Sequence, residues 1–121
     1  MEMVWRGSRN FEKATQIFTG VLYYLYMPPP GFCYAWYCTD QPIMDDPRLF
    51  DVNVKEKVDA FVNYVCKQAL YYKTKNVIIT MGSDFTYENA NAWFKNIDKL
   101  IHYVNKVYKE LFICFACPSL D

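Results

Sequence analysis

The residues best suited to chemistry surround a carboxylate that lies between an apolar run and a helical pattern. The run over residues 76–81 stops at Gly82, and Asp84 follows two positions later. In α/β folds the carboxyl end of a strand is where ligands and catalytic groups gather. Flanking by Phe85 and Tyr87 would remove water from the Asp84 carboxyl and keep its proton in place, as a general acid requires. The alternative for Asp84 is a cap on the helix that follows.

The cysteines are the second set of reactive residues, and their number is odd. Cys33 and Cys38 bracket a short loop, where they could form a local disulfide typical of an oxidising compartment or remain two buried thiols. Cys114 and Cys117 have the spacing of a zinc pair but no second pair of ligands, so we do not expect a metal there. The single histidine, His102, lies inside a helical pattern and is expected to be a surface or hydrogen-bonded helix residue.

Two helices are predicted to position these residues. Over residues 53–73, apolar side chains recur every three to four positions, and Asn53 with Glu56 resembles a capping box. Over residues 88–108, an apolar stripe runs from Trp93 to the end of the pattern.

The strands are predicted to be few. Residues 2–6 alternate weakly, residues 76–81 read as a strand with a core that is apolar on both faces, and residues 111–117 form another apolar run. A strand that is apolar on both faces is typical of a parallel sheet covered by helices. Residues 11–19 read as a helical turn or irregular chain, and the proline- and aromatic-rich residues 20–47 read as a packed loop.

The order of these elements predicts an α/β fold. Three strands and two helices are too few for a closed barrel or a complete open sheet, so we expect a partial (β/α)-type barrel with parallel strands, incomplete within this chain. The 121 residues suffice for one domain, and their high apolar content excludes disorder.

Charge and hydropathy exclude some classes of partner. Thirteen basic residues balance thirteen acidic ones, which argues against a charge-driven nucleic-acid or membrane partner. The longest apolar stretch, residues 17–26, is too short to span a bilayer. The first residues lack a basic region followed by an apolar one, so we expect no signal peptide in this chain. The sequence does not predict an oligomeric state.

A longer match gives these features a context. Residues 81–101 read MGSDFTYENANAWFKNIDKLI, and this run closely resembles the catalytic domain of the lysosomal-type α-mannosidases of glycoside hydrolase family 38. Further blocks agree with the family in the same order: Val4-Trp5-Arg6, Phe18-Thr19-Gly20-Val21-Leu22, Tyr26-Met27-Pro28-Pro29, Cys33 and Cys38, and Asp45-Asp46-Pro47. The resemblance spans about residues 3–107, so residues 1–107 are expected to be a fragment of the family's N-terminal catalytic domain and residues 108–121 a divergent tail.

The resemblance implies an activity and roles for individual residues. The family hydrolyses terminal α-linked mannose from glycoprotein oligosaccharides with retention of configuration, in the lysosome or secretory pathway, with a zinc ion on the sugar hydroxyls. One aspartate of the family is both nucleophile and zinc ligand, and a second is the acid/base. The acid/base motif falls on Asp84, the active-site arginine on Arg6, and the tyrosine that contacts mannose on Tyr26.

Departures from the family pattern limit what this chain is expected to do. The zinc-binding His-X-Asp-X-Gly-Trp motif, the segment with the nucleophile and the later zinc-binding histidine are not in this sequence. Where the family has Cys-Trp/Phe-Asp, this chain has Cys33-Tyr34-Ala35. We therefore expect an enzyme by family whose fragment is inactive alone, with zinc held in the parent enzyme by residues outside this chain. The alternative is a non-catalytic truncated remnant that at most binds a glycan or a protein.

Overall fold

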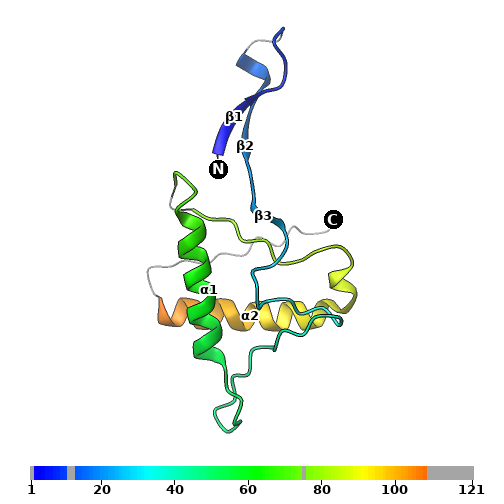
Figure 1. Cartoon of the computed structure of the whole chain (residues 1–121), viewed down its shortest axis with the longest axis vertical. Coiled ribbons are helices and arrows are strands. Elements are labelled where there is room, and N and C mark those ends of the chain that lie inside the picture. The colour runs from blue at the N-terminus through cyan, green and yellow to red at the C-terminus, as the bar shows by residue number, and fades with distance from the viewer. Residues whose placement is uncertain (1, 11–12, 75, 109–121) are drawn as a thin grey trace.

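The computed structural model describes residues 2–10, 13–74 and 76–108. Its elements in chain order are β1 (Glu2–Arg6), η1 (Lys13–Thr15), β2 (Gln16–Gly20), β3 (Tyr23–Tyr26), α1 (Val54–Ala69), η2 (Thr86–Asn89) and α2 (Ala90–Val107) (Figure 1). The predicted strand over residues 2–6 and both predicted helices are confirmed, although α1 ends at Ala69 rather than at residue 73. The predicted strand over residues 111–117 lies outside the described residues.

The sheet differs from the prediction of parallel strands. β1 pairs with β2 in antiparallel register, from Glu2 opposite Gly20 to Arg6 opposite Gln16. The sequence interpretation of residues 11–19 missed β2, because its residues show little alternation. An antiparallel pair needs only a short connection, so it forms between neighbouring segments, whereas a parallel pair needs a long crossover. The expected partial (β/α)-type barrel is therefore wrong for the described residues, which hold a two-stranded antiparallel sheet and two α-helices.

The second correction concerns residues 76–81, which do not form a strand. Side chains rather than a strand ladder bond to this segment. Gln68 Nε2 donates to the Ile78 carbonyl oxygen at 2.9 Å, and Thr80 Oγ1 donates to the Met27 carbonyl oxygen at 2.8 Å. Ile78 is 73% exposed, whereas Ile79 and Met81 are partly buried against the core, so the segment is covered on one side and not on both. An apolar pattern on both faces indicates burial only when the segment is a strand between two neighbouring strands in a sheet. Residues 76–81 have no such neighbours among the described residues.

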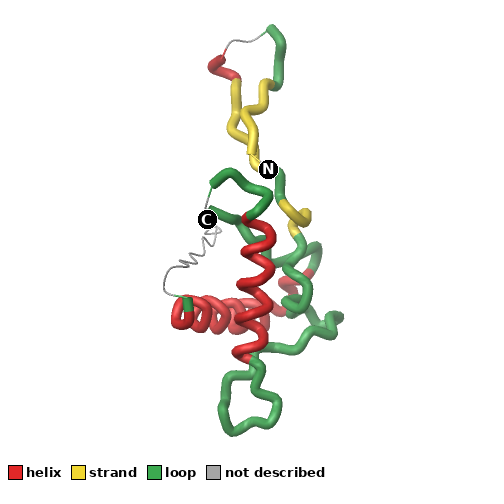
Figure 2. Tube along the Cα trace, turned by 60° about the vertical axis from the view of Figure 1, so that its left-hand side comes forward, coloured by secondary structure: helices red, strands yellow, loops and turns green. Residues whose placement is uncertain are grey.

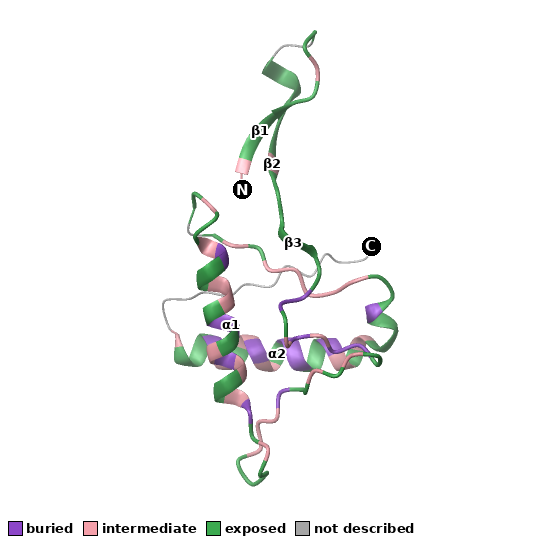
Figure 3. Cartoon of the chain, in the orientation of Figure 1, coloured by how far each residue is buried: buried purple, intermediate pink, exposed green. Residues whose placement is uncertain are grey.

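The core lies where α1 crosses α2, and the loop before α1 completes it (Figures 1 and 2). In Figure 3, buried residues concentrate on the two helices and this loop, while the β1–β2 hairpin is almost entirely exposed. The buried apolar residues are Phe32, Tyr34, Ala35, Ile43, Val58, Phe61, Val62, Trp93, Ile97, Leu100 and Val104. The predicted packed loop over residues 20–47 is confirmed only in part. Phe32, Tyr34 and Ile43 pack into the core, whereas residues 20–27, which include β3, are exposed. Among the described residues, no helix combines the length and apolar character that crossing a bilayer requires.

Asn53 does not act as the predicted capping box. It stands at the N-cap of α1 but makes no capping hydrogen bond there. Its Oδ1 instead accepts from the Met44 backbone N–H at 2.8 Å, and its Nδ2 donates to the Pro42 carbonyl oxygen at 2.9 Å. The side chain therefore fixes the loop before α1 rather than the first turn of the helix.

Polar side chains on α2 hold the same loop from the other side. Asn96 Oδ1 accepts from the Ile43 backbone N–H at 2.7 Å. Lys99 Nζ donates to the Ile43 carbonyl oxygen at 3.1 Å and to Asp45 Oδ1 at 2.6 Å. The hydrogen bond from Lys99 lowers the pKa of the Asp45 carboxyl, and Tyr103 adds a weaker contribution in the same direction. Loop and helix are thus joined by hydrogen bonds at the edge of the apolar core.

Candidate functional site

Asp84 lies at the corner of a tight turn that Thr86 closes. Thr86 Oγ1 accepts from the Ser83 backbone N–H at 3.0 Å and donates to the Ser83 carbonyl oxygen at 2.9 Å. The Thr86 backbone N–H donates to the same carbonyl at 3.3 Å. Phe85 completes the turn with a left-handed φ of 59°. Because Thr86 is buried and Asp84 is exposed, the turn presents the carboxylate outward from an anchored base.

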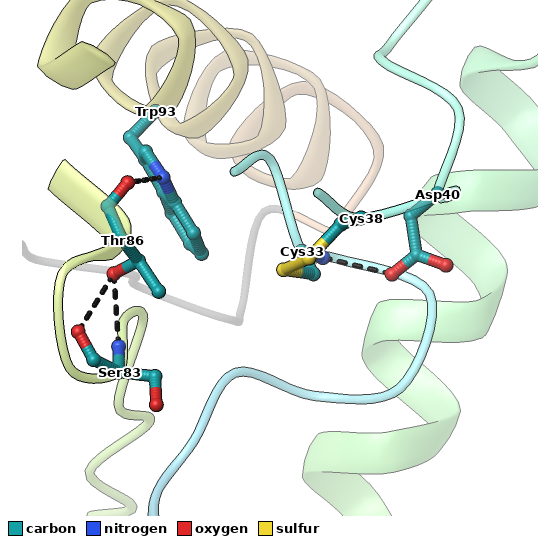
Figure 4. The surroundings of a disulfide bond; sticks show 6 residues. All are labelled: Cys33, Cys38, Asp40, Ser83, Thr86 and Trp93. Atoms are coloured by element: carbon teal, nitrogen blue, oxygen red, sulfur yellow. Dashed lines mark hydrogen bonds between the residues drawn. A yellow bond between two sulfur atoms is a disulfide. The ribbon is translucent and has the colours of Figure 1, made fainter. Parts of the chain in front are cut away.

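Aromatic residues anchor this turn to α2. Trp93 Nε1 donates to the Thr86 carbonyl oxygen at 2.7 Å, as Figure 4 shows. The ring of Tyr87 stacks on that of Trp93 with 5.0 Å between centroids, and its hydroxyl donates to the Met81 carbonyl oxygen at 2.5 Å. A Cβ at Gly82 would lie 3.0 Å from the Tyr87 ring, so any larger residue there would require the ring to shift. The sequence predicted Trp93 only as a core residue.

Tyr26 meets Asp84 although 58 residues separate them in sequence. The Tyr26 hydroxyl donates to Asp84 Oδ2 at 3.2 Å. This hydrogen bond, with the negative charge of the carboxylate, raises the pKa of the Tyr26 hydroxyl. The bond between Thr80 and the Met27 carbonyl joins the same two segments a few residues away. Two of the three residues singled out by the family resemblance are thus neighbours.

The surroundings of Asp84 differ from two expectations. Asp84 is not a helix cap, because Phe85 and Asn89 occupy the N-cap positions of η2 and α2 and the Asp84 carboxylate accepts from Tyr26. Flanking aromatics do not shield it either, since Asp84 is exposed and Phe85 is 83% exposed. Asp84 still has the residue type and the position that a general acid requires. The described residues do not exclude water from it, contrary to the expectation from the sequence.

Arg6 is not brought to this pair. It is exposed on β1, and the β1–β2 hairpin projects away from the helices and from η2 (Figure 1). Within the described residues, Glu2 at the start of β1 contacts the segment after α1, through the Lys73 backbone N–H and the Thr74 hydroxyl at 3.3 Å each. The family resemblance assigned Arg6 and Asp84 to one active site, but the described residues do not bring the two side chains together.

A disulfide closes the loop that packs beside the site. Cys33 and Cys38 are bonded, with their Cα atoms 5.9 Å apart. The Cys33 backbone N–H donates to Asp40 Oδ2 at 2.9 Å, so a carboxylate still braces this loop (Figure 4). Sequence reasoning missed Asp40, which lies two residues beyond the second cysteine.

Tyr34 in this loop has a buried hydroxyl without a hydrogen-bond partner in the described part of the chain. Its ring packs edge-on against Trp93, and burial, with the nearby charge of Asp40, raises the pKa of the hydroxyl. Leaving a buried polar group unpaired costs about 1–3 kcal/mol. We predict that Tyr34→Phe raises the free energy of unfolding by about 1–2 kcal/mol, because it removes the unpaired group and keeps the ring.

Urea denaturation of the 121-residue chain measures this change. Tyr37→Phe is the matched control, since the Tyr37 side chain is 50% exposed and its substitution should change stability by less than about 0.5 kcal/mol. A loss of stability on Tyr34→Phe would show that the hydroxyl has a partner.

The described residues do not fit a zinc site. Across residues 2–10, 13–74 and 76–108, no three carboxylate, thiol or imidazole groups gather closely enough to hold a metal ion. The imidazole of exposed His102 packs edge-on against Tyr103, and Cys66 is an exposed free thiol on α1. Cys114 and Cys117 lie outside the described residues.

Comparison with known proteins identifies the family of this chain. The sequence model of the glycosyl hydrolases family 38 N-terminal domain matches residues 1–118. This chain belongs to glycosyl hydrolase family 38. The division at residue 107 between catalytic-domain fragment and divergent tail stays a prediction.

Relatives within family 38 include animal and plant α-mannosidases. The chain is 52% identical over 106 residues to human lysosomal α-mannosidase, covering 87% of this chain and 10% of that protein. It is 45% identical over 106 residues to α-mannosidase of Canavalia ensiformis, covering 88% of this chain and 11% of that protein. It is 42% identical over 120 residues to α-mannosidase At3g26720 of Arabidopsis thaliana, covering 99% of this chain and 12% of that protein. The chain thus spans about a tenth of the length of these family 38 relatives.

Proposed function

We propose that this chain is the acid/base-bearing section of a retaining α-mannosidase. The substrates would be glycoprotein oligosaccharides with terminal α-linked mannose, and the compartment the lysosome or secretory pathway. The observation that carries the proposal is the Tyr26–Asp84 pair, an exposed carboxylate on an anchored turn in a chain of family 38. The relatives named lysosomal α-mannosidase support the substrate class and the compartment, and the disulfide suits an oxidising compartment.

The proposed chemistry assigns Asp84 two proton transfers. In the first step its carboxyl group gives a proton to the glycosidic oxygen as the bond from mannose C1 to that oxygen breaks, and a second carboxylate forms a bond to C1. In the second step the Asp84 carboxylate takes a proton from water while the water oxygen bonds to C1 and the ester breaks. One water is consumed, and mannose and the leaving alcohol are released.

Tyr26 has a positioning role in this proposal. Its hydroxyl already bonds the Asp84 carboxylate, so it can fix the direction in which the proton is delivered. Its half-exposed ring would also offer a face to the mannose. Arg6 would steady negative charge near the pair only where the rest of the enzyme brings β1 to the site.

The second carboxylate and the zinc ligands belong to other parts of the longer enzyme in this proposal. A retaining mechanism needs two carboxyl groups about 5–5.5 Å apart, so Asp84 by itself cannot complete the reaction. When bound, zinc would polarise the sugar hydroxyls. The described residues offer no set of ligands for it.

The test compares the isolated chain with a chimera. We predict that the 121 residues alone do not hydrolyse an aryl α-mannoside, because half of the carboxyl pair is missing. A chimera in which this chain replaces the matching 106-residue segment of human lysosomal α-mannosidase is expected to hydrolyse it. Turnover by the isolated chain that Asp84→Asn abolishes would contradict the first expectation. A folded but inactive chimera would favour the non-catalytic remnant instead.

A further inference from the structure

Both strained backbone positions in the described part of the chain adjoin the candidate site. Outside glycine, the positive φ angles there are 46° at Leu25 and 59° at Phe85. Leu25 precedes Tyr26, and Phe85 follows Asp84, so each strained residue neighbours one partner of the hydrogen-bonded pair. A bulky side chain in this region costs free energy, and such positions cluster at active sites and ligand clamps.

Phe85 does not contribute to the core in return for this cost. Its side chain is 83% exposed, whereas Thr86, the next residue, is 3% exposed. The bonds from Thr86 to Ser83 and from Trp93 to Thr86 hold the strained turn in place from beneath. The strained conformation of Phe85 therefore places its aromatic ring in solvent, next to Asp84 in the sequence.

The chemistry of the reaction indicates what this ring would contact. An acid that protonates a glycosidic oxygen lies between the mannose and the sugar that leaves. Tyr26 reaches Asp84 from a different segment and is the residue assigned to the mannose. Phe85 directly follows Asp84 in the sequence, and its exposed ring can contact the departing group. Sugar rings have apolar C–H faces, and a rigid aromatic ring covers such a face at little entropic cost.

We propose that Phe85 forms a wall of the leaving-group subsite and stacks on the pyranose ring that departs. The proposal rests on the α-mannosidase function proposed above and adds a residue that selects among substrates by their leaving group. Binding energy from this contact is gained only when the leaving group is a sugar.

Two substrates separate this role from a structural one. An α-linked mannobiose has a pyranose leaving group, whereas α-mannosyl fluoride has none. In the active chimera, we expect Phe85→Ala to lower kcat/KM for the mannobiose by about tenfold and to leave kcat/KM for the fluoride within about twofold. Phe85→Gly should give the same selectivity, and because glycine accepts a positive φ without strain, this variant should fold at least as well.

Trp36→Ala is the matched control, since Trp36 is another exposed aromatic residue, at 77% exposure. This substitution should leave kcat/KM unchanged for both substrates. An equal loss on both substrates would overturn the proposal by showing that the ring is structural. Unchanged kinetics on both substrates in Phe85→Ala and Phe85→Gly would overturn it by showing that no ring contact exists. A parent chimera inactive on both substrates would sink the mannosidase function and this proposal together, whereas an active parent with unaltered selectivity would sink only this proposal.

Discussion

Asp84→Asn in the chimera with human lysosomal α-mannosidase should lower kcat/KM for a mannobiose by about 10²- to 10⁴-fold. The asparagine amide keeps the size of the side chain and can still accept a hydrogen bond from Tyr26. It cannot give a proton to the glycosidic oxygen, so a sugar would have to leave as an alkoxide. Steady-state kinetics on natural and activated substrates measures the effect.

The pattern across leaving groups makes this expectation specific. α-Mannosyl fluoride needs little assistance in leaving, so its loss on Asp84→Asn should be far smaller than that of the mannobiose. Asp98→Asn is the matched control, because it removes the same charge from an exposed carboxylate on α2 and should not change the kinetics. A uniform loss across all leaving groups would contradict the acid role and favour a general effect on folding or binding.

Trp93→Ala should have the largest effect on stability, at about 3–5 kcal/mol. Trp93 is 0% exposed, packs against Tyr34 and Tyr87, and donates to the Thr86 carbonyl oxygen. Its removal would open a cavity between α2 and the disulfide loop and would release the turn below Asp84. Because a domain is typically stable by about 5–15 kcal/mol, this loss alone could unfold the chain.

Urea denaturation followed by circular dichroism measures the Trp93 effect without depending on tryptophan fluorescence. Phe94→Ala is the control on the same helix, because the Phe94 side chain is 47% exposed and its loss should cost less than about 1 kcal/mol. Similar losses for both variants would show that Trp93 is not the residue on which the core depends.

The helices could be predicted from the sequence because their signal is local. Apolar residues at helical spacing fixed the positions of α1 and α2, and Trp93 was correctly expected on the buried stripe of α2. Residues 76–81 could not be predicted in the same way. An apolar run becomes a strand only when another strand supplies its hydrogen bonds, and that depends on segments elsewhere in the chain.

The site was predictable in residue type and only partly in geometry. The family resemblance selected Asp84 and Tyr26, and the structure joins them by a hydrogen bond across 58 residues. It selected Arg6 as well, which lies on the projecting hairpin. No sequence rule indicates a left-handed conformation at a phenylalanine, so the strained backbone of Phe85 could not be predicted from the sequence. The Ser83–Thr86 clamp had a weak signal in its spacing of three residues, which suits a side-chain-closed turn.

The projecting hairpin has a consequence for how the molecule opens and closes. β1 pairs only with β2, its neighbour in the sequence, among the described residues. The residues of this hairpin are almost entirely exposed, and none belongs to the core of α1 and α2. Such a segment can lose its structure and regain it as a unit of its own while the helical core stays intact. Opening of the hairpin would move Arg6 and break the contacts of Glu2 with Lys73 and Thr74, while the hydrogen bond between Tyr26 and Asp84 would be kept.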